Sequence, residues 1–205
     1  ISRKYDKAEH AYPKELDMLA SLIDGMNEGG EGINAGAAVG KRGETETGNK
    51  NGNNMSTALG IIEMCYGDTG LLLSMPRQGL GNSAIAAVAN DEQLERFKGT
   101  WAAMAITEPG CGSDSAAIRT TATQDGDEYI LNGEKIFVTS GDRADSVVVW
   151  ATLDKKLGRA AIKSFVVPKG TAGMKVERLE HKLGIKASDT AVISFIDCRV
   201  PAANL

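Results

Sequence analysis

The stretch Ile106-Thr107-Glu108-Pro109-Gly110-Cys111-Gly112-Ser113-Asp114 concentrates glycine and small polar residues in one short loop. Glycine permits close backbone approach and dihedral angles closed to other residues, so N–H groups near Gly110 and Gly112 can converge on an anion. Ser113 adds a hydroxyl donor there. An ordinary connecting loop has a similar composition. The stretch therefore indicates an anion-binding loop only together with a second motif.

That second motif is Asn132-Gly133-Glu134-Lys135-Ile136-Phe137-Val138-Thr139-Ser140. Phe137 and Thr139 are two residues apart on a predicted strand, so their side chains share one face. This face can offer an aromatic ring and a hydroxyl group to a ligand. Packing of Phe137 and Val138 in the core of a β-domain is the alternative interpretation.

Around these motifs, from Trp101 onward, the hydrophobic pattern has a period of two, which is typical of strands. The turn pairs Asp125-Gly126 and Asn132-Gly133 bracket a strand at 128–131, as in consecutive hairpins. The pattern predicts further strands over 134–139, 146–153, 164–167, 174–179 and 191–196. Several short strands separated by turns favour an antiparallel β-barrel or sandwich.

The residues before Trp101 favour helices, because apolar side chains recur there at steps of three and four. A helix is predicted within 5–24, and others from residue 54, over 83–89 and over 91–97, with Asp91 as a possible cap. The segment 25–54 is rich in Gly, Asn and Glu and is predicted to be a loop or linker. The apolar stripes of the first two helices are Tyr12, Leu16, Leu19 and Ile23, then Met55, Leu59, Ile62 and Tyr66.

These patterns predict the α+β class, with an N-terminal α-helical domain over 1–100 and an antiparallel β-barrel or sandwich domain over 101–205. The formal net charge of -4 argues against a sequence-independent nucleic-acid binder. No apolar run is long enough to span a membrane, and the three cysteines are isolated, which favours a reducing, cytoplasmic location. His10 and His181 are the only histidines, so a zinc site of ordinary composition would have too few ligands unless carboxylates dominated it, and no metal site is expected.

The two motifs, in this order, resemble the flavin-binding loop and the following hairpin of the acyl-CoA dehydrogenase family. A third segment, Lys182-Leu183-Gly184-Ile185-Lys186-Ala187-Ser188-Asp189-Thr190, and the closing 199–205 are similar to the same family. The resemblance implies FAD as cofactor and α,β-dehydrogenation of an acyl-CoA thioester in fatty acid β-oxidation, a part of lipid metabolism. It also implies electron transfer to an electron-transfer flavoprotein and a homotetramer built as a dimer of dimers.

By this resemblance, Thr107 bonds the pyrimidine edge of the flavin, and Ser113 faces both its pyrophosphate and the acyl-CoA substrate. Phe137 lies beside the ring, where the family usually has Trp, and Thr139 bonds the hydride-accepting N5. Cys111 replaces a usual Ala. The implied cofactor-binding set is Met104, Ala105, Ile106, Thr107, Gly112, Ser113, Phe137, Val138 and Thr139.

No catalytic residue is assigned, because the family's catalytic base is a glutamate of a C-terminal helical bundle that is expected outside these 205 residues. Glu108 belongs to the binding loop and is not promoted to that role. One alternative is a non-catalytic or partner-dependent subunit of a hetero-oligomer that holds flavin or CoA. Another is a Rossmann-type nucleotide-binding protein, from the glycines at 79–84, although Pro76 interrupts the strand such a motif needs.

Overall fold

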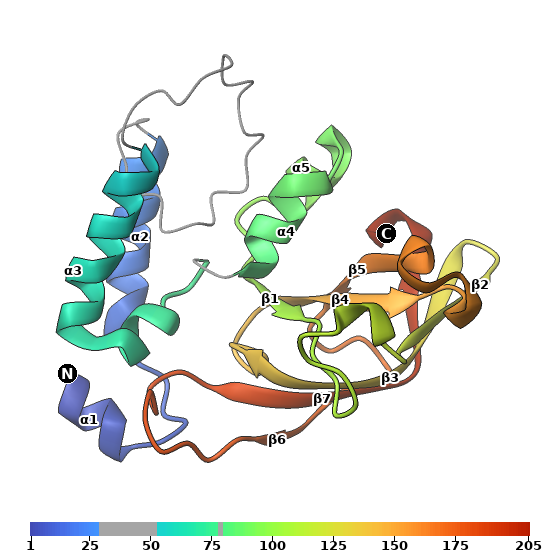
Figure 1. Cartoon of the computed structure of the whole chain (residues 1–205). Coiled ribbons are helices and arrows are strands. Elements are labelled where there is room, and N and C mark those ends of the chain that lie inside the picture. The colour runs from blue at the N-terminus through green and yellow to red at the C-terminus, as the bar shows by residue number, and fades with distance from the viewer. Residues whose placement is uncertain (29–52, 78–79) are drawn as a thin grey trace. The chain divides into compact units, whose positions relative to one another are not determined.

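The computed structural model describes residues 1–28, 53–77 and 80–205 (Figure 1). These residues form two compact units. Unit 1 comprises Ile1–Gly99 with His181–Ser188, and unit 2 comprises Thr100–Glu180 with Asp189–Leu205. Helices come first along the chain and a curled sheet follows, which confirms the predicted α+β class. No helix in the described ranges is long and apolar enough to cross a membrane.

The helices of unit 1 are α1 (Ser2–Lys7), α2 (Glu15–Glu28), α3 (Asn53–Leu73), α4 (Leu80–Val88) and α5 (Asp91–Arg96). Two of them, α2 and α3, are longer than the others. A capping box starts α5, in which Asn90 accepts a bond from the Gln93 N–H and the Gln93 side chain accepts one from the Asn90 N–H. The predicted cap at Asp91 is therefore wrong by one residue.

The single helix predicted within 5–24 is two helices in the structure, α1 and α2. Pro13 lies between them, and proline cannot donate the N–H that a continuing helix requires. Leu16 is buried in unit 1 as predicted, whereas Leu19 is 41% exposed. Of the segment predicted as a loop, 25–28 and 53–54 are helical, and 29–52 lie outside the described residues.

The apolar stripe predicted on the second helix is present on α3, but its side chains are exposed. Met55, Leu59, Ile62 and Tyr66 have exposed fractions between 56% and 92%. The spacing of three and four residues thus predicted the helix correctly, but it did not predict that these side chains are exposed. The residues just before α4, at 74–77, form turns rather than a strand, which removes the context that a Rossmann phosphate loop needs.

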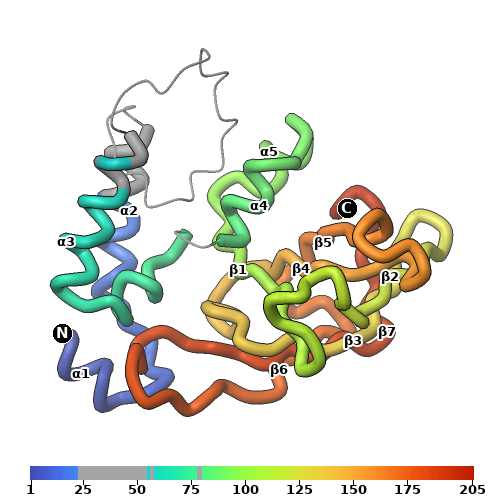
Figure 2. Tube along the Cα trace, in the orientation of Figure 1, coloured from blue at the N-terminus to red at the C-terminus, as the bar shows by residue number. Residues whose placement is uncertain are grey.

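Unit 2 is a curled, mostly antiparallel seven-stranded sheet, which Figure 2 traces along the Cα path. The strand order is β1-β4-β2-β3-β7-β6, and β5 pairs with β4. Two pairs, β1 with β4 and β2 with β4, are parallel. The strands are β1 (Ala102–Ala105), β2 (Thr121–Asp125), β3 (Glu128–Thr139), β4 (Ser146–Thr152), β5 (Ile162–Pro168), β6 (Met174–Leu179) and β7 (Thr190–Pro201).

The turn predicted at Asp125-Gly126 joins β2 to β3, with Asp125 opposite Glu128. The turn predicted at Asn132-Gly133 is absent, because β3 continues through these residues with a shift in its register against β7. Gly133 has a φ of 155° there, and a Cβ on it would lie 2.4 Å from Thr120 Oγ1. The glycine therefore serves close packing inside an irregular strand.

The core of unit 2 lies inside the curl of the sheet and contains side chains from β1 to β5 and from β7. Leu131 of β3, Val149 of β4 and Ile193 of β7 are fully buried there. The rings of Tyr129 and Phe165 pack with their centroids 5.1 Å apart. Because both edges of β3 are paired in this core, the strand is a rigid support for the loop that follows β1.

Candidate functional site

The loop of the first motif follows β1 and lies against the second motif on β3. The Ile136 N–H donates to the Thr107 carbonyl at 2.9 Å, and Lys135 Nζ donates to the Ile106 carbonyl at 3.0 Å. The sequence predicted that the two motifs form one site. The contacts at 106–107 and 135–136 bring them together.

A buried carboxylate, Glu108, fixes this loop. Its oxygens accept bonds from Lys135 Nζ at 2.8 Å, Thr120 Oγ1 at 2.6 Å, and the N–H groups of Arg119 at 2.6 Å and Thr120 at 2.9 Å. Glu108 and Cys111 exchange two backbone bonds, at 3.0 and 3.2 Å, that close the turn between them. The carboxylate therefore joins the loop, the residues just before β2 and the middle of β3.

The Glu108–Lys135 ion pair is almost fully withdrawn from water, with side-chain exposed fractions of 5% and 0%. Burial raises the pKa of Glu108, but the bonds from Lys135, Thr120 and the two N–H groups outweigh burial, so this pKa is below its usual range. Burial lowers the pKa of Lys135, and the bond to Glu108 offsets part of that effect. The pair is a structural clamp that holds the loop in one conformation.

Sequence reasoning missed the role of this pair. The sequence placed Glu108 in the binding loop, and no partner was predicted for it or for Lys135. Lysine is rarely buried in a strand unless it is paired with an acid. The position of Lys135 within a predicted strand was therefore a sequence signal for such a pair.

The predicted cofactor-binding residues fall into three groups by exposure. Two side chains, Ala105 and Val138, are buried in the core of unit 2. Met104 on β1 is half-buried, as are Ile106 and Thr107 at the start of the loop. The exposed residues are Gly112, Ser113, Phe137 and Thr139.

Phe137 lies in a β-bulge on β3. The register against β7 shifts between Lys135 and Val138, and Phe137 has a φ of 58°, in the left-handed region. Its side chain is 60% exposed, whereas Val138 is 1% exposed. The alternative interpretation as core packing therefore holds for Val138 and fails for Phe137. Phe137 and Thr139 both face solvent, as the predicted shared face requires.

The dihedral argument for the loop glycines is not borne out. Neither Gly110 nor Gly112 has a positive φ. A Cβ on Gly112 would meet nothing within 4 Å, so the space above this residue is open. The loop glycines thus leave room beside the backbone and do not supply an unusual conformation.

The turn after β3 is fixed by a second buried acid, Asp189, from the third motif. Asp189 accepts bonds from Arg143 Nε at 2.5 Å and from the Asp142 N–H at 3.0 Å, and its carbonyl accepts from the Ser140 N–H at 3.1 Å. Ser140 has a φ of 61° in this turn. The third motif therefore supports the end of the strand that carries Thr139.

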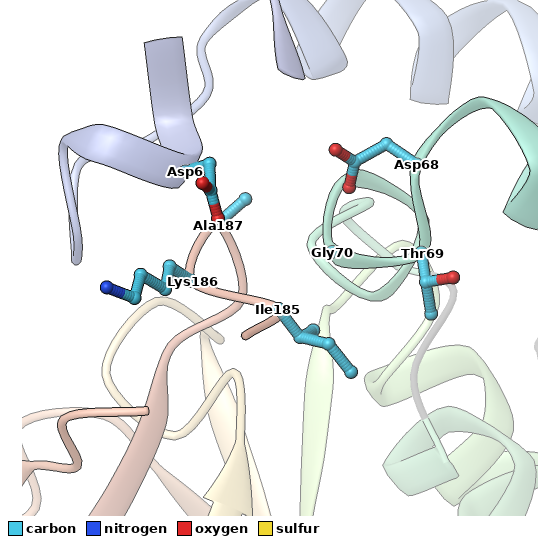
Figure 3. Close-up of a pocket in the computed structure, with 7 residues that line it drawn as sticks. All are labelled: Asp6, Asp68, Thr69, Gly70, Ile185, Lys186 and Ala187. Atoms are coloured by element: carbon cyan, nitrogen blue, oxygen red, sulfur yellow. The ribbon is translucent and has the colours of Figure 1, made fainter. Parts of the chain in front are cut away.

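The structure also contains a cavity of about 210 Å³ in unit 1 (Figure 3). It is smaller than the roughly 300–1,000 Å³ of typical cofactor sites. None of the predicted cofactor-binding residues lines it, so we do not assign the cofactor to it. Its lining residues are Asp6, Asp68, Thr69, Gly70, Ile185, Lys186 and Ala187.

Comparison with known proteins shows which family this chain resembles. The family model for the acyl-CoA dehydrogenase middle domain matches residues 103–198. A short-chain specific acyl-CoA dehydrogenase of Clostridium acetobutylicum is 36% identical over 168 residues, covering 78% of this chain and 44% of the relative. An acryloyl-CoA reductase (NADH) of Anaerotignum propionicum is 42% identical over 130 residues, covering 60% of this chain and 33% of the relative.

A solved structure agrees with these matches. The butyryl-CoA dehydrogenase of Megasphaera elsdenii aligns with a TM-score of 0.75 at 29% identity, covering 97% of this chain and 52% of that protein. The chain thus spans between about a third and a half of the length of these proteins.

Proposed function

We propose, since this chain belongs to the acyl-CoA dehydrogenase family, that it takes part in flavin-dependent α,β-dehydrogenation of an acyl-CoA thioester. Proteins similar to it carry the names short-chain specific acyl-CoA dehydrogenase and butyryl-CoA dehydrogenase. We propose FAD as its cofactor. The observation that carries the proposal is the Glu108–Lys135 pair, which holds the first motif against the second. We further propose 1–100 as a helical domain and 101–205 as the domain that binds FAD and acyl-CoA.

We propose that Thr107, Ser113 and Thr139 make the polar contacts with FAD and that Phe137 packs beside its ring. Ala105 and Val138 are buried, so they contribute through backbone groups. Met104, Ile106 and Gly112 complete the proposed site.

The described residues fit such a cofactor. Phe137 and Thr139 offer an aromatic ring and a hydroxyl group outside the core, and the backbone at Gly112 is open to close approach. When bound, FAD supplies the hydride acceptor for the reaction. The chain's own contribution is to hold these groups on a rigid sheet, because Glu108 and Asp189 fix the loop and the turn on either side of β3.

Ser113 is the residue we propose to contact the acyl-CoA. We propose that the catalytic base comes from outside residues 1–205. Glu108 is unsuited to that role, because its carboxylate is 5% exposed and already accepts bonds from Lys135, Thr120 and Arg119. A base must reach the proton that it removes.

The finer parts of the proposal concern partners and location. We propose an electron-transfer flavoprotein as electron acceptor, a homotetramer or hetero-oligomer, and a cytoplasmic role in fatty acid β-oxidation. Light scattering tests the oligomeric state. Because the proposed base lies outside residues 1–205, an acyl-CoA should reduce the bound flavin only when the segment or partner that supplies the base is present. Reduction by residues 1–205 alone would contradict this part of the proposal.

A titration with FAD tests the site itself, with fluorescence anisotropy of the flavin as the readout. Thr139→Val removes one hydroxyl and should weaken FAD binding roughly 3- to 10-fold, the value of one hydrogen bond. Thr123→Val makes the same change at an exposed position of β2 and should leave the affinity unchanged. Equal affinities for the two variants would contradict the assignment of Thr139.

A further inference from the structure

Unit 1 brings together the only two histidines of the chain, which are far apart in the sequence. The ring centroids of His10 and His181 are 5.3 Å apart, with the rings tilted by 54°. Glu9 is the third member, and His181 Nδ1 is 3.1 Å from Glu9 Oε2. One nitrogen or carboxylate oxygen from each residue lies within 4.8 Å of the others. Two imidazoles and a carboxylate are a donor set that zinc uses.

The backbone holds two of these side chains in place. His10 follows α1 in a tight turn closed by a bond from the Ala11 N–H to the Ala8 carbonyl, and it has a φ of 68°. The second oxygen of Glu9 accepts a bond from the Lys182 N–H at 2.9 Å. This bond holds Oε1 of the carboxylate in place and leaves Oε2 facing His181.

The ring of His10 lacks partners for its nitrogens. Nδ1 and Nε2 are both buried, and neither forms a hydrogen bond within the described part of the chain. Neutral imidazole has one donor and one acceptor nitrogen, and buried polar groups without partners are costly. A metal ion that accepted the lone pair of one nitrogen would satisfy that group.

We propose that Glu9, His10 and His181 bind a divalent transition-metal ion, with Zn²⁺ as the representative ion and water completing the coordination. Ligands about 2.0–2.1 Å from a tetrahedral zinc ion are roughly 3.3 Å apart, close to the separation of His181 Nδ1 and Glu9 Oε2. The His181 side chain is 85% exposed and free to adjust toward His10. The bound ion would connect the turn after α1 with the segment 181–188 of the same unit.

The test is a titration of the metal-stripped chain with ZnCl₂, followed by histidine ring NMR signals and calorimetry. Because the chain has two histidines, two sets of ring signals report on the site. Both should shift together and saturate at one equivalent. His181→Gln should weaken Zn²⁺ binding at least about tenfold. Removal of a residue that only supports a metal ligand already costs about this much affinity. The exposed side chain of His181 can be replaced without disturbing the fold.

Glu92→Gln removes an exposed carboxylate of α5 and is the matched control for Glu9→Gln. The control should bind Zn²⁺ like the unmodified chain, and Glu9→Gln should bind it at least about tenfold more weakly. Zinc binding that leaves both histidine signals unmoved would place the ion elsewhere and overturn the proposal. Unchanged affinity in His181→Gln would overturn it as well.

Discussion

At the scale of single residues, the Glu108–Lys135 pair is the contact on which the proposed site depends. The two residues are 27 positions apart, and their side-chain atoms meet at 2.8 Å with almost no exposure to solvent. Removing one member of a buried pair leaves a charge without its partner, which costs far more than losing an exposed pair. The pair therefore has consequences for stability that can be measured.

Lys135→Met should lower the free energy of unfolding by about 3 kcal/mol, because Glu108 would remain buried without its counter-charge. Urea denaturation measures this change. The matched control is Lys175→Met, since Lys175 forms an exposed pair with Glu177 and should cost less than about 1 kcal/mol. Equal, small changes in both variants would show that the buried pair does not hold the loop.

The pH dependence of stability should report the carboxylate of this pair. The pKa of Glu108 is lowered from 4.5 in the folded state, so its contribution is present above pH 4.5 and is lost as pH falls through the folded pKa. The stability difference between the unmodified chain and Glu108→Gln should therefore shrink below pH 4.5. Comparing the two chains cancels the acids remote from the site. A difference independent of pH would contradict the lowered pKa.

Substitution of Phe137 should affect FAD binding with little effect on stability. Its positive φ suits glycine, so Phe137→Gly should change the free energy of unfolding by less than about 1 kcal/mol. The affinity for FAD should fall roughly 3- to 10-fold, because an aromatic stacking partner is lost. Ile196→Ala, at another exposed apolar position of unit 2, is the control and should not alter the affinity. An unchanged affinity in Phe137→Gly would remove the ring from the site.

At the scale of elements, the irregularities of β3 shape the site. The register shifts between Leu131 and Gly133 and again between Lys135 and Val138, and the second shift exposes Phe137. An unbroken strand would alternate strictly and would give each residue from Gly133 to Thr139 a fixed face. Continued alternation from buried Lys135 would bury Phe137 and expose Val138, and the bulge reverses these two faces.

Gly133→Ala should be strongly destabilising, by about 2–3 kcal/mol, because its Cβ would overlap Thr120 in a packed region. Gly112→Ala is the matched control. Its Cβ meets nothing within 4 Å, so the free energy of unfolding should change by less than about 0.5 kcal/mol. Thermal or urea unfolding of both variants checks this. A tolerated Gly133→Ala would show that β3 can relax at this point.

Most elements could be predicted from the sequence, and the failures have physical causes. The predictions over 146–153 and 174–179 located β4 and β6 closely, because β4 is a run of buried apolar residues and β6 largely alternates between exposed and less exposed residues. The Asn132-Gly133 pair was predicted to be a turn because its local preference favours one. Pairing on both sides of β3, with β2 and β7, overrides that preference. Pro13 was a local signal that the helix prediction over 5–24 overlooked.

At the scale of the whole molecule, the change of hydrophobic period near Trp101 predicted the α+β class and the order of helices before sheet. The contacts that join distant segments could not be predicted, because one sequence does not show which side chains meet. Glu108 with Lys135 in unit 2, and His10 with His181 in unit 1, are examples. The polar groups of the proposed site were predicted by resemblance, whereas the buried pair that holds them was found only in the structure.

The most direct test of the central claim is the absorption spectrum of the purified, folded chain after incubation with FAD and removal of unbound cofactor. The chain should retain one FAD, with flavin bands between about 350 and 500 nm, and the Ser113→Ala/Thr139→Val double variant should lose those bands. A folded chain that retains no FAD would contradict the account. So would a double variant that retains FAD as well as the unmodified chain.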